Sequence, residues 1–247
     1  MAFHISIDDL TRADGTAANG DPETLQYAVY GTKSDNTQGL LFSDLTETAP
    51  QAVKNDDGSF TLNLSLPKNS TFKIAFWAET DCDKTASEPK FQRYIFDREN
   101  ATVTMRYGNG LVNTTDADAY YAYTTKQTTG AGETAQISLK RPFSQINIGT
   151  TSSDDVNKIL ANNKAESWIT LSGAEFPDIL NLEDGSVSFS EIIDDHSSIR
   201  FQTTRMPQNI TYPVEGYTYL GLVYVLSTAP TPIVGSEGTQ DASSTNT

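Results

Sequence analysis

Short runs in which apolar and polar residues alternate recur along this chain, and they restrict it to β-structure. Residues 60–66 (Phe-Thr-Leu-Asn-Leu-Ser-Leu) place four apolar side chains on one face of an extended strand and three polar ones on the other. Turn residues such as Asp57-Gly58 separate these runs. Similar runs occupy residues 1–8, 25–30, 72–79, 102–105, 120–123, 135–139, 141–150, 167–171, 199–201 and 217–226, and residues 179–189 predict a hairpin with an Asp184-Gly185 turn. Repeated strands with turns between them predict an all-β chain of antiparallel β-sandwiches rather than an α/β fold.

One segment departs from this alternation and indicates a domain boundary. Residues 153–162 combine a capping serine with apolar residues at helical spacing, which predicts a short helix near a domain boundary. We therefore predict an N-terminal β-sandwich domain over residues 1–150 and a C-terminal one over residues 151–228. Few strands remain for the second domain, so the sequence leaves its completeness open. Residues 229–247 are polar, and a disordered tail is predicted there.

The charge balance argues against a nucleic-acid partner, and the lack of long apolar runs argues against a membrane span. The 247 residues carry 32 acidic and 17 basic side chains, which gives a net charge of −15. Such a surface repels the phosphates of nucleic acids, so no nucleic-acid partner is expected. No run reaches the roughly 18 apolar residues that a span needs, so no direct membrane span is expected. The first residues also lack the basic and apolar blocks of an export signal.

Residues that carry chemistry are few. The chain has two histidines, His4 and His196, and one cysteine, Cys82. A zinc site needs about three or four such ligands, and a nucleophile needs a base within hydrogen-bond reach. Carboxylates on both sides of Cys82 also disfavour its reactive thiolate form. We therefore expect no enzyme, no cofactor and no metal.

Oxygen ligands for calcium are more plentiful. Acidic side chains gather at residues 55–58, 116–118 and 154–155. None of these segments follows the Asp-x-Asp-x-Asp-Gly loop with a distal glutamate that typifies a calcium site. We interpret them as turns and as a helix N-terminus.

Three segments together carry a resemblance to a known family. Residues 72–79 contain Phe-Trp-Ala, residues 141–150 have the sequence Arg-Pro-Phe-Ser-Gln-Ile-Asn-Ile-Gly-Thr, and residues 217–226 form a long apolar strand. In this order they resemble the fimbrillin-like surface proteins, the type V pilus subunits of Bacteroidota. The resemblance implies two tandem transthyretin-like β-sandwiches at the cell surface, in the outer membrane or fimbrium. It also implies cell adhesion, a lipoprotein anchor in a longer precursor, and partners that are other fimbrial subunits or host or bacterial surface ligands.

The resemblance also points to particular residues. In fimbrillins similar to this chain, an arginine-directed protease cuts after the first strand, and a strand of another subunit fills the groove that is exposed. Here Arg12 is the candidate site of proteolytic processing, and Phe3, Ile5 and Ile7 are the apolar side chains of the displaceable strand. Strand addition of this kind takes affinity from main-chain hydrogen bonds and specificity from pockets for alternate side chains. An ordinary loop arginine is the other interpretation of Arg12.

A second function is compatible with the same features. A surface glycan-binding lipoprotein of a polysaccharide-uptake system would share the β-sandwich, the acidity and the location. Sugar binding calls for exposed aromatic rings, and Trp77 and Trp168 lie in apolar strands that predict burial. Tyr120, Tyr121 and Tyr123 are the better exposed candidates, because alternation places Tyr121 on the opposite face from its neighbours.

Overall fold

The computed structural model describes residues 1–7, 22–79, 93–107, 117–130, 132–151, 168–172, 175–191, 198–202 and 214–227. These residues form sixteen β-strands in five sheets, and no α-helix occurs among them. The predicted all-β fold is therefore confirmed. The helix predicted over residues 153–162 and the tail over residues 229–247 lie outside the described residues. The division into tandem domains near residue 150 stays a prediction.

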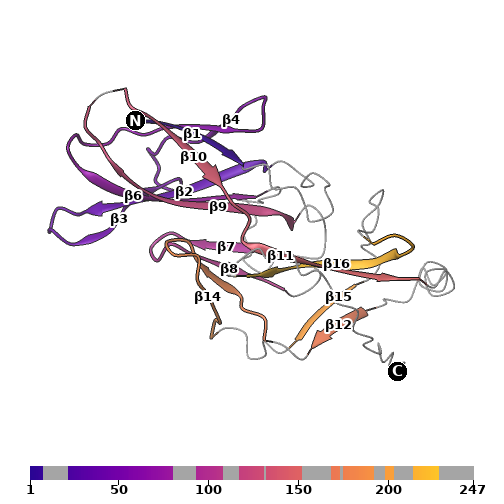
Figure 1. Ribbon diagram of the computed structural model, residues 1–247. Helices are drawn as coiled ribbons and strands as arrows, with labels where there is room; N and C mark the ends of the chain where they lie inside the picture. Colours follow the sequence, from indigo (N-terminus) through magenta and orange to yellow (C-terminus); the bar gives the residue numbers. More distant parts are fainter. Residues whose placement is uncertain are drawn as a thin grey trace.

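Two four-stranded sheets stack face to face to form a β-sandwich (Figure 1). The first sheet contains, in spatial order, β10 (Thr134–Leu139), β1 (Ala2–Ile7), β5 (Phe60–Asn63) and β4 (Val53–Lys54). The second contains β3 (Gln38–Ser43), β2 (Thr24–Thr32), β6 (Thr71–Glu79) and β9 (Ala119–Gln127). Alternate side chains of both sheets meet in one core, and Phe3, Tyr27, Phe60 and Phe76 are among its fully buried members.

The second sheet is buried on both of its faces. Tyr27 and Phe76 belong to the sandwich core, whereas the next residues along each strand, Ala28 and Trp77, belong to a second core. All four side chains are 0% exposed. Strands β2 and β6 therefore carry near-continuous apolar runs rather than a strict alternation, as expected for strands that are covered twice.

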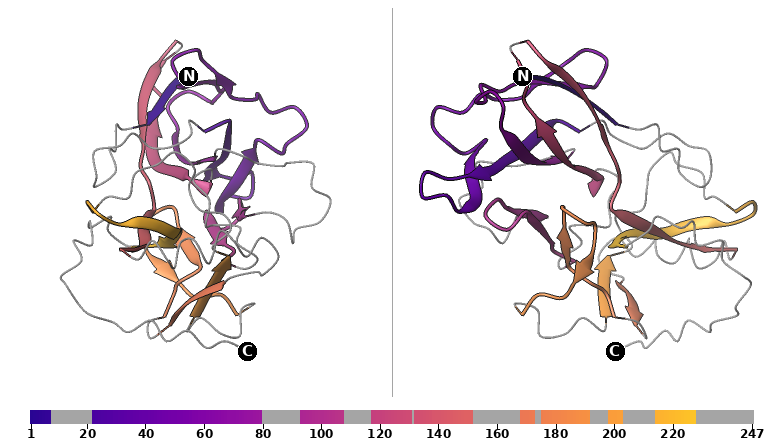
Figure 2. Two further views of the ribbon diagram at one scale, coloured as in Figure 1. Left: turned by 90° about the vertical axis from the view of Figure 1, so that its right-hand side faces the viewer. Right: turned by 60° about the vertical axis from the view of Figure 1, so that its left-hand side comes forward.

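A second group of strands lies on the outer side of that sheet (Figures 1 and 2). One four-stranded sheet contains, in spatial order, β14 (Val187–Ser188), β13 (Ile179–Asn181), β8 (Thr102–Met105) and β7 (Tyr94–Asp97). Two further pairs join β11 (Phe143–Thr150) to β16 (Thr218–Leu226) and β12 (Trp168–Ser172) to β15 (Ser198–Gln202). Because β8 pairs with β13 and β11 with β16, segments from both sides of residue 150 build this group.

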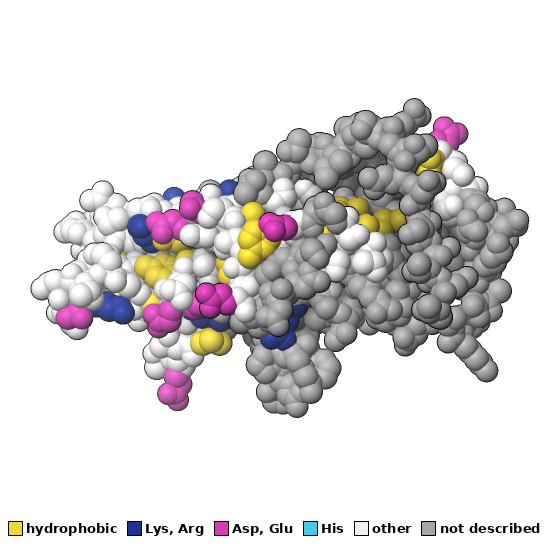
Figure 3. Space-filling model, turned by 90° about the horizontal axis from the view of Figure 1, so that it is seen from below, with side chains coloured by type: hydrophobic (Ala, Val, Ile, Leu, Met, Phe, Trp, Pro, Cys, Tyr) yellow, Lys and Arg dark blue, Asp and Glu magenta, His cyan; other side chains and the backbone are white. Residues whose placement is uncertain are grey.

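The hairpin of β13 and β14 contacts the sandwich through its turn. Gly185, in the predicted Asp-Gly turn, has a φ of +75°. A Cβ atom at this glycine would lie 2.7 Å from the Tyr121 hydroxyl, so both the backbone conformation and the available space require glycine. Two residues before Gly185, Glu183 Oε1 lies 2.5 Å from Lys73 Nζ of β6. Figure 3, which views the molecule from below, shows acidic, basic and exposed apolar side chains on the described surface.

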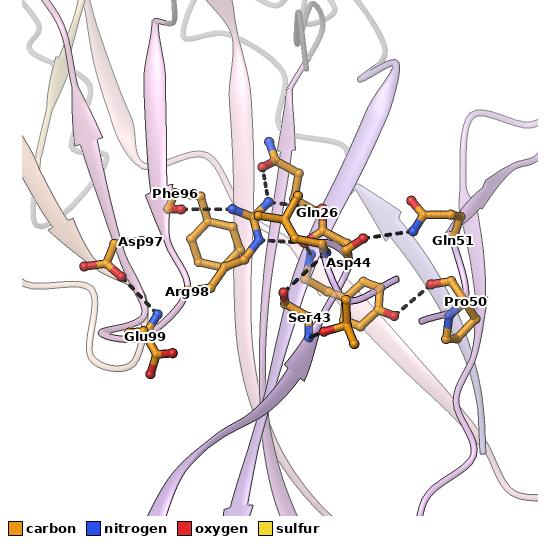
Figure 4. A network of polar contacts seen from close by, with 12 residues as sticks. Gln26, Ser43, Asp44, Pro50, Gln51, Phe96, Asp97, Arg98 and Glu99 are labelled. Carbon is orange, nitrogen blue, oxygen red and sulfur yellow. Dashed lines mark hydrogen bonds and ion pairs between the residues drawn. The ribbon is translucent and has the colours of Figure 1, made fainter. Parts of the chain in front are cut away.

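An arginine network joins the sandwich to the second group of strands (Figure 4). Arg98 lies between β7 and β8, and it makes a bidentate contact with Asp44, which follows β3. The distances are 2.7 Å from Arg98 Nε to Asp44 Oδ1 and 3.0 Å from Nη2 to Oδ2. The same guanidinium donates to Gln26 Oε1 over 2.7 Å and lies 4.8 Å from the centre of the Phe96 ring. Because only 13% of the Arg98 side chain and 2% of the Asp44 side chain are exposed, little water screens this pair.

We expect Arg98→Met to lower the free energy of unfolding by about 3–5 kcal/mol, because Asp44 would stay buried without its counter-charge. Urea denaturation followed by intrinsic fluorescence measures this change. Lys73→Met is the matched control, since it breaks an ion pair whose two side chains are half exposed and screened by water. Equal losses of stability in the two variants would contradict this difference between the pairs.

Buried tyrosines make the stability of the fold depend on alkaline pH. Burial, together with the nearby Asp44 carboxylate, raises the pKa of Tyr27 to about 12. Burial, together with Asp118, also raises the pKa of Tyr120 to about 12. In an unfolded chain, tyrosines ionise near pH 10. The folded protein holds these phenolic protons more tightly, so their stabilising contribution is complete below pH about 10 and is lost as the pH rises towards about 12.

We therefore expect the midpoint of urea unfolding to fall as the pH is raised from about 9 to about 11. Ultraviolet absorbance of tyrosinate, recorded at each pH with and without urea, should show that part of the tyrosine signal appears only on unfolding. Tyr27→Phe should weaken the pH dependence, because it removes one of the shifted groups. A midpoint that stays constant over this range would contradict the assignment.

Candidate strand-exchange site

The first strand occupies the middle of the first sheet of the sandwich (Figure 1). β1 runs parallel to β10 on one side, where Ile5 lies opposite Ile137. It runs antiparallel to β5 on the other side, where Ile5 lies opposite Phe60. The pairing with β10 is the one parallel pair among the described strands. We call the position between β10 and β5 the β1 slot.

The side chains of β1 alternate between the core and the outer face of the sheet. Phe3 and Ile5 are 0% exposed, and the Phe3 ring lies 5.9 Å from that of Phe76, centre to centre, at an interplanar angle of 58°. Ile7 packs against the same core but is partly exposed. His4, between the two buried residues, belongs to the outer face, as alternation requires. The apolar half of β1 thus fills one wall of the sandwich core.

Main-chain hydrogen bonds hold both edges of β1. The terminal amine of Met1 donates to Leu64 O over 2.8 Å, and Leu64 N donates to Met1 O over 2.9 Å. On the opposite edge, Ala2 N donates to Glu133 O over 2.7 Å. If β1 left the slot, backbone groups on the two flanking strands would therefore lose their hydrogen-bond partners. The core sites of the two fully buried side chains, Phe3 and Ile5, would also be empty.

The structure describes the predicted strand residues of this site but not the predicted cleavage site. Phe3, Ile5 and Ile7 come together on the inner face of β1, as the alternation predicts. Arg12, the candidate processing site, lies outside the described residues. Displacement of β1 and cleavage at Arg12 both stay predictions.

Sequence reasoning did not identify the strands that flank β1. The alternation of residues 135–139 predicts a strand with one buried face, and so does that of residues 60–66. Their buried faces match that of β1, but many strands of this chain have such a face. Pairing partners far apart in sequence leave no local signal, so only the structure reveals the slot.

Polar residues that the sequence offered as ligands are used within the fold. In the turn at residues 55–58, the Asp57 carboxylate accepts hydrogen bonds from the backbone and hydroxyl of Ser59, which lower its pKa. Asp118 forms a buried ion pair with Arg141. Within the described ranges, no three His, Cys, Asp or Glu side chains are grouped so that they could hold a metal ion. The described segments also contain no helix with the length and apolar character to cross a membrane.

The aromatic residues differ in part from the sequence-based expectation. Trp77 is fully buried, as predicted, whereas the side chain of Trp168 is not described. Tyr120 and Tyr121 lie in opposite cores of the second sheet, but they are only 1% and 6% exposed. The expectation that they are exposed is therefore wrong, because the sheet that carries them is covered on both faces. Tyr123 is partly exposed.

We expect Ile5→Ala to lower the free energy of unfolding by about 2–5 kcal/mol, because it opens a cavity in the sandwich core. Ser6→Ala, on the outer face of the same strand, should change it by at most about 0.5 kcal/mol. Urea denaturation of both variants measures the difference. Similar values for the two would show that β1 contributes its backbone alone to stability.

Comparison with known proteins shows what this chain resembles. Residues 2–231 match a family of unknown function, DUF6562. No curated protein matches the chain. A solved structure from Bacteroides thetaiotaomicron, whose name proposes a polysaccharide-binding protein (DUF1812), has a TM-score of 0.51 and 13% identity, over 91% of this chain and 71% of that one.

Two further solved structures come from Bacteroides thetaiotaomicron and Parabacteroides distasonis. A Bacteroides thetaiotaomicron protein whose name proposes an adhesin has a TM-score of 0.50 and 10% identity, over 91% of this chain and 68% of that one. A fimbrial assembly protein from Parabacteroides distasonis has a lower TM-score of 0.40 and 14% identity, over 89% of this chain and 76% of that one. At these identities the two Bacteroides thetaiotaomicron proteins indicate a shared fold only. The match over residues 2–231 establishes that the chain belongs to the DUF6562 family.

Proposed function

We propose that this protein is a cell-surface fimbrial subunit or adhesin-like structural protein that assembles, or binds its partners, by exchange of the strand in the β1 slot. The observation that carries this proposal is the central position of β1, between one parallel and one antiparallel neighbour. Its partners would be other fimbrial subunits or surface ligands that offer an extended strand. The proposal includes membership of the fimbrillin-like group, a location in the outer membrane or fimbrium, a lipid anchor in a longer precursor, and no enzymatic activity.

A central slot gives an incoming strand more than a sheet edge would. A strand added at an edge gains one ladder of main-chain hydrogen bonds and leaves its own outer edge open. A strand in the β1 slot gains two ladders, since β1 is in register with six residues of β10 and four of β5. It also places alternate side chains at the sites of Phe3 and Ile5, where shape decides which strand fits.

The name of one similar structure supports this proposal. One Bacteroides thetaiotaomicron protein of the same fold is named as a proposed adhesin. Binding by strand addition uses main-chain hydrogen bonds and needs no catalytic residues. Exchange at β1 would also give the predicted cleavage at Arg12 a purpose, because Arg12 follows β1 in the sequence.

The test uses the full chain with Ile5→Asp, which puts a charge at a fully buried site and so expels β1 from the slot. A synthetic peptide with the sequence of residues 1–7 should then bind and raise the unfolding temperature. At a peptide concentration about 100 times Kd, the stabilisation should be about 2.7 kcal/mol. Thermal unfolding with increasing peptide concentration measures it.

Two controls make the peptide experiment specific. A peptide that carries Asp in place of both Phe3 and Ile5 should have no effect, because a charged aspartate side chain does not fit the apolar core. Ile74→Ala weakens the same core but keeps β1 intact, so the wild-type peptide should not stabilise that variant. Absence of any peptide effect on the Ile5→Asp chain would refute strand exchange at this slot.

Glycan binding is the alternative function, and one comparison favours it. A Bacteroides thetaiotaomicron protein of the same fold is named as a proposed polysaccharide-binding protein. The burial of Tyr120 and Tyr121 removes two of the three aromatic residues that the sequence offered for sugar stacking. Calorimetric titration of the wild-type chain with a panel of polysaccharides discriminates, since the strand-exchange function predicts no heat.

A further inference from the structure

Strand β10 forms one wall of the β1 slot, and it would lose its pairing within the first sheet if β1 left. In the first sheet, β10 is an edge strand with β1 as its neighbour, whereas β5 keeps its pairing with β4. Without β1, no ladder within that sheet would hold β10 in place. The slot would then close or spread unless other contacts fix β10.

The beginning of β10 is fixed by the turn that precedes it. The Glu133 carboxylate accepts hydrogen bonds from the backbone nitrogens of Thr129, over 2.8 Å, and Gly130, over 2.7 Å. Thr128 N donates to Ser70 O over 2.9 Å, and Asn69 N donates to Thr128 O over 2.7 Å. These contacts tie the turn to the segment before β6, in the opposite sheet, and none of them involves β1.

The end of β10 is fixed to the opposite sheet as well. Lys140, the residue after β10, exchanges two backbone hydrogen bonds with Tyr121 of β9, of 2.8 and 2.9 Å. Its ammonium group also lies 4.8 Å from the centre of the Tyr121 ring. This bridge connects the two sheets of the sandwich at the point where the chain leaves β10.

The next residue, Arg141, adds a buried charge to this connection. Arg141 Nη2 donates to Asp118 Oδ2, and the Tyr120 hydroxyl donates to the same oxygen over 3.1 Å. Asp118 is 0% exposed and Arg141 is 9% exposed. A buried charge without its partner is strongly unfavourable, so each of the two residues restricts where the other can lie.

We propose that Asp118 and Arg141 are positioning residues that keep β10 in place when β1 leaves, so that the slot stays open for an incoming strand. This inference rests on the proposed strand exchange, because it concerns the same slot. The pair acts through β10, to which Arg141 is joined by Lys140 alone. It also gives a role to Arg141, the first residue of the Arg-Pro-Phe sequence at residues 141–143.

The position of β10 can be measured across the slot with two spin labels. Gln136→Cys on β10 and Asn63→Cys on β5 place them at exposed residues on either side of β1, and Cys82→Ser keeps the labelling specific. Pulsed electron spin resonance then gives the distribution of distances between the labels. Each variant of the full chain is measured with Ile5→Asp, which expels β1, and with the milder Ile5→Ala, which keeps β1 in the slot and serves as the reference.

With Arg141 intact, we expect a narrow distance peak in the Ile5 variants, because β10 keeps its place. Adding Arg141→Met to the Ile5→Asp chain should abolish the narrow peak and the capture of the residue 1–7 peptide. Arg98→Met is the matched control: it breaks another buried ion pair of the same protein, whose hydrogen-bond partners Asp44 and Gln26 do not belong to β10, and should leave the peak narrow. A general loss of stability would affect both arginine variants alike.

Three results would overturn the positioning role. These are a narrow peak that survives Arg141→Met in the Ile5→Asp chain, a peak lost there equally with Arg98→Met, and a peak already lost in the Ile5→Asp chain while Arg141 is present. Failure of strand exchange is a separate outcome, since the peptide would then fail to bind although the peak stays narrow. The distance and the peptide measurements therefore judge the two proposals independently.

Discussion

Burial of the sheet β3-β2-β6-β9 on both of its faces is the constraint on which the rest of this structure depends. Tyr27 and Phe76 contribute to one core, and their neighbours Ala28 and Trp77 contribute to the other. A sheet with two apolar faces is unstable unless both are covered, so neither the first sheet nor the second group of strands is optional. The small side chains of Ala28 and Ala75 on the outer face leave room for close packing there.

This arrangement separates the β1 slot from the second group of strands. The β1 slot lies in the first sheet, on one side of the doubly covered sheet, and the second group of strands lies on the other. Contacts such as Arg98 with Asp44 join the second group to β2 and β3 and do not involve β1. A change of occupant in the slot therefore need not disturb the strands on the far side. Under the proposed strand exchange, the rest of the molecule can therefore remain folded while the occupant of the slot changes.

The sequence predicts the strands better than their partners. Alternation over residues 60–66 and 135–139 identifies β5 and β10, and the Asp-Gly turn at Gly185 identifies the β13–β14 hairpin. β3 escapes prediction because Leu40, Leu41 and Phe42 are adjacent apolar residues, which a β-bulge opposite Val29 and Tyr30 accommodates. β4 is too short to show a pattern. The parallel pairing of β1 with β10 joins residues more than a hundred positions apart, and no local pattern can report it.

Arg141 shows where a motif can be identified without its physical role. Pro142 and the alternating isoleucines that follow predict the beginning of β11, and they leave the arginine unexplained. Its partner, Asp118, stands 23 residues earlier, in an acidic segment that we interpret from the sequence as a turn. A charged residue flanked by Leu139 and Phe143, with no local counter-charge, is itself a signal that a distant one exists, since buried charges are paired. That signal names no partner, so the positioning role of the pair follows only when the two sheets are seen to meet at β10.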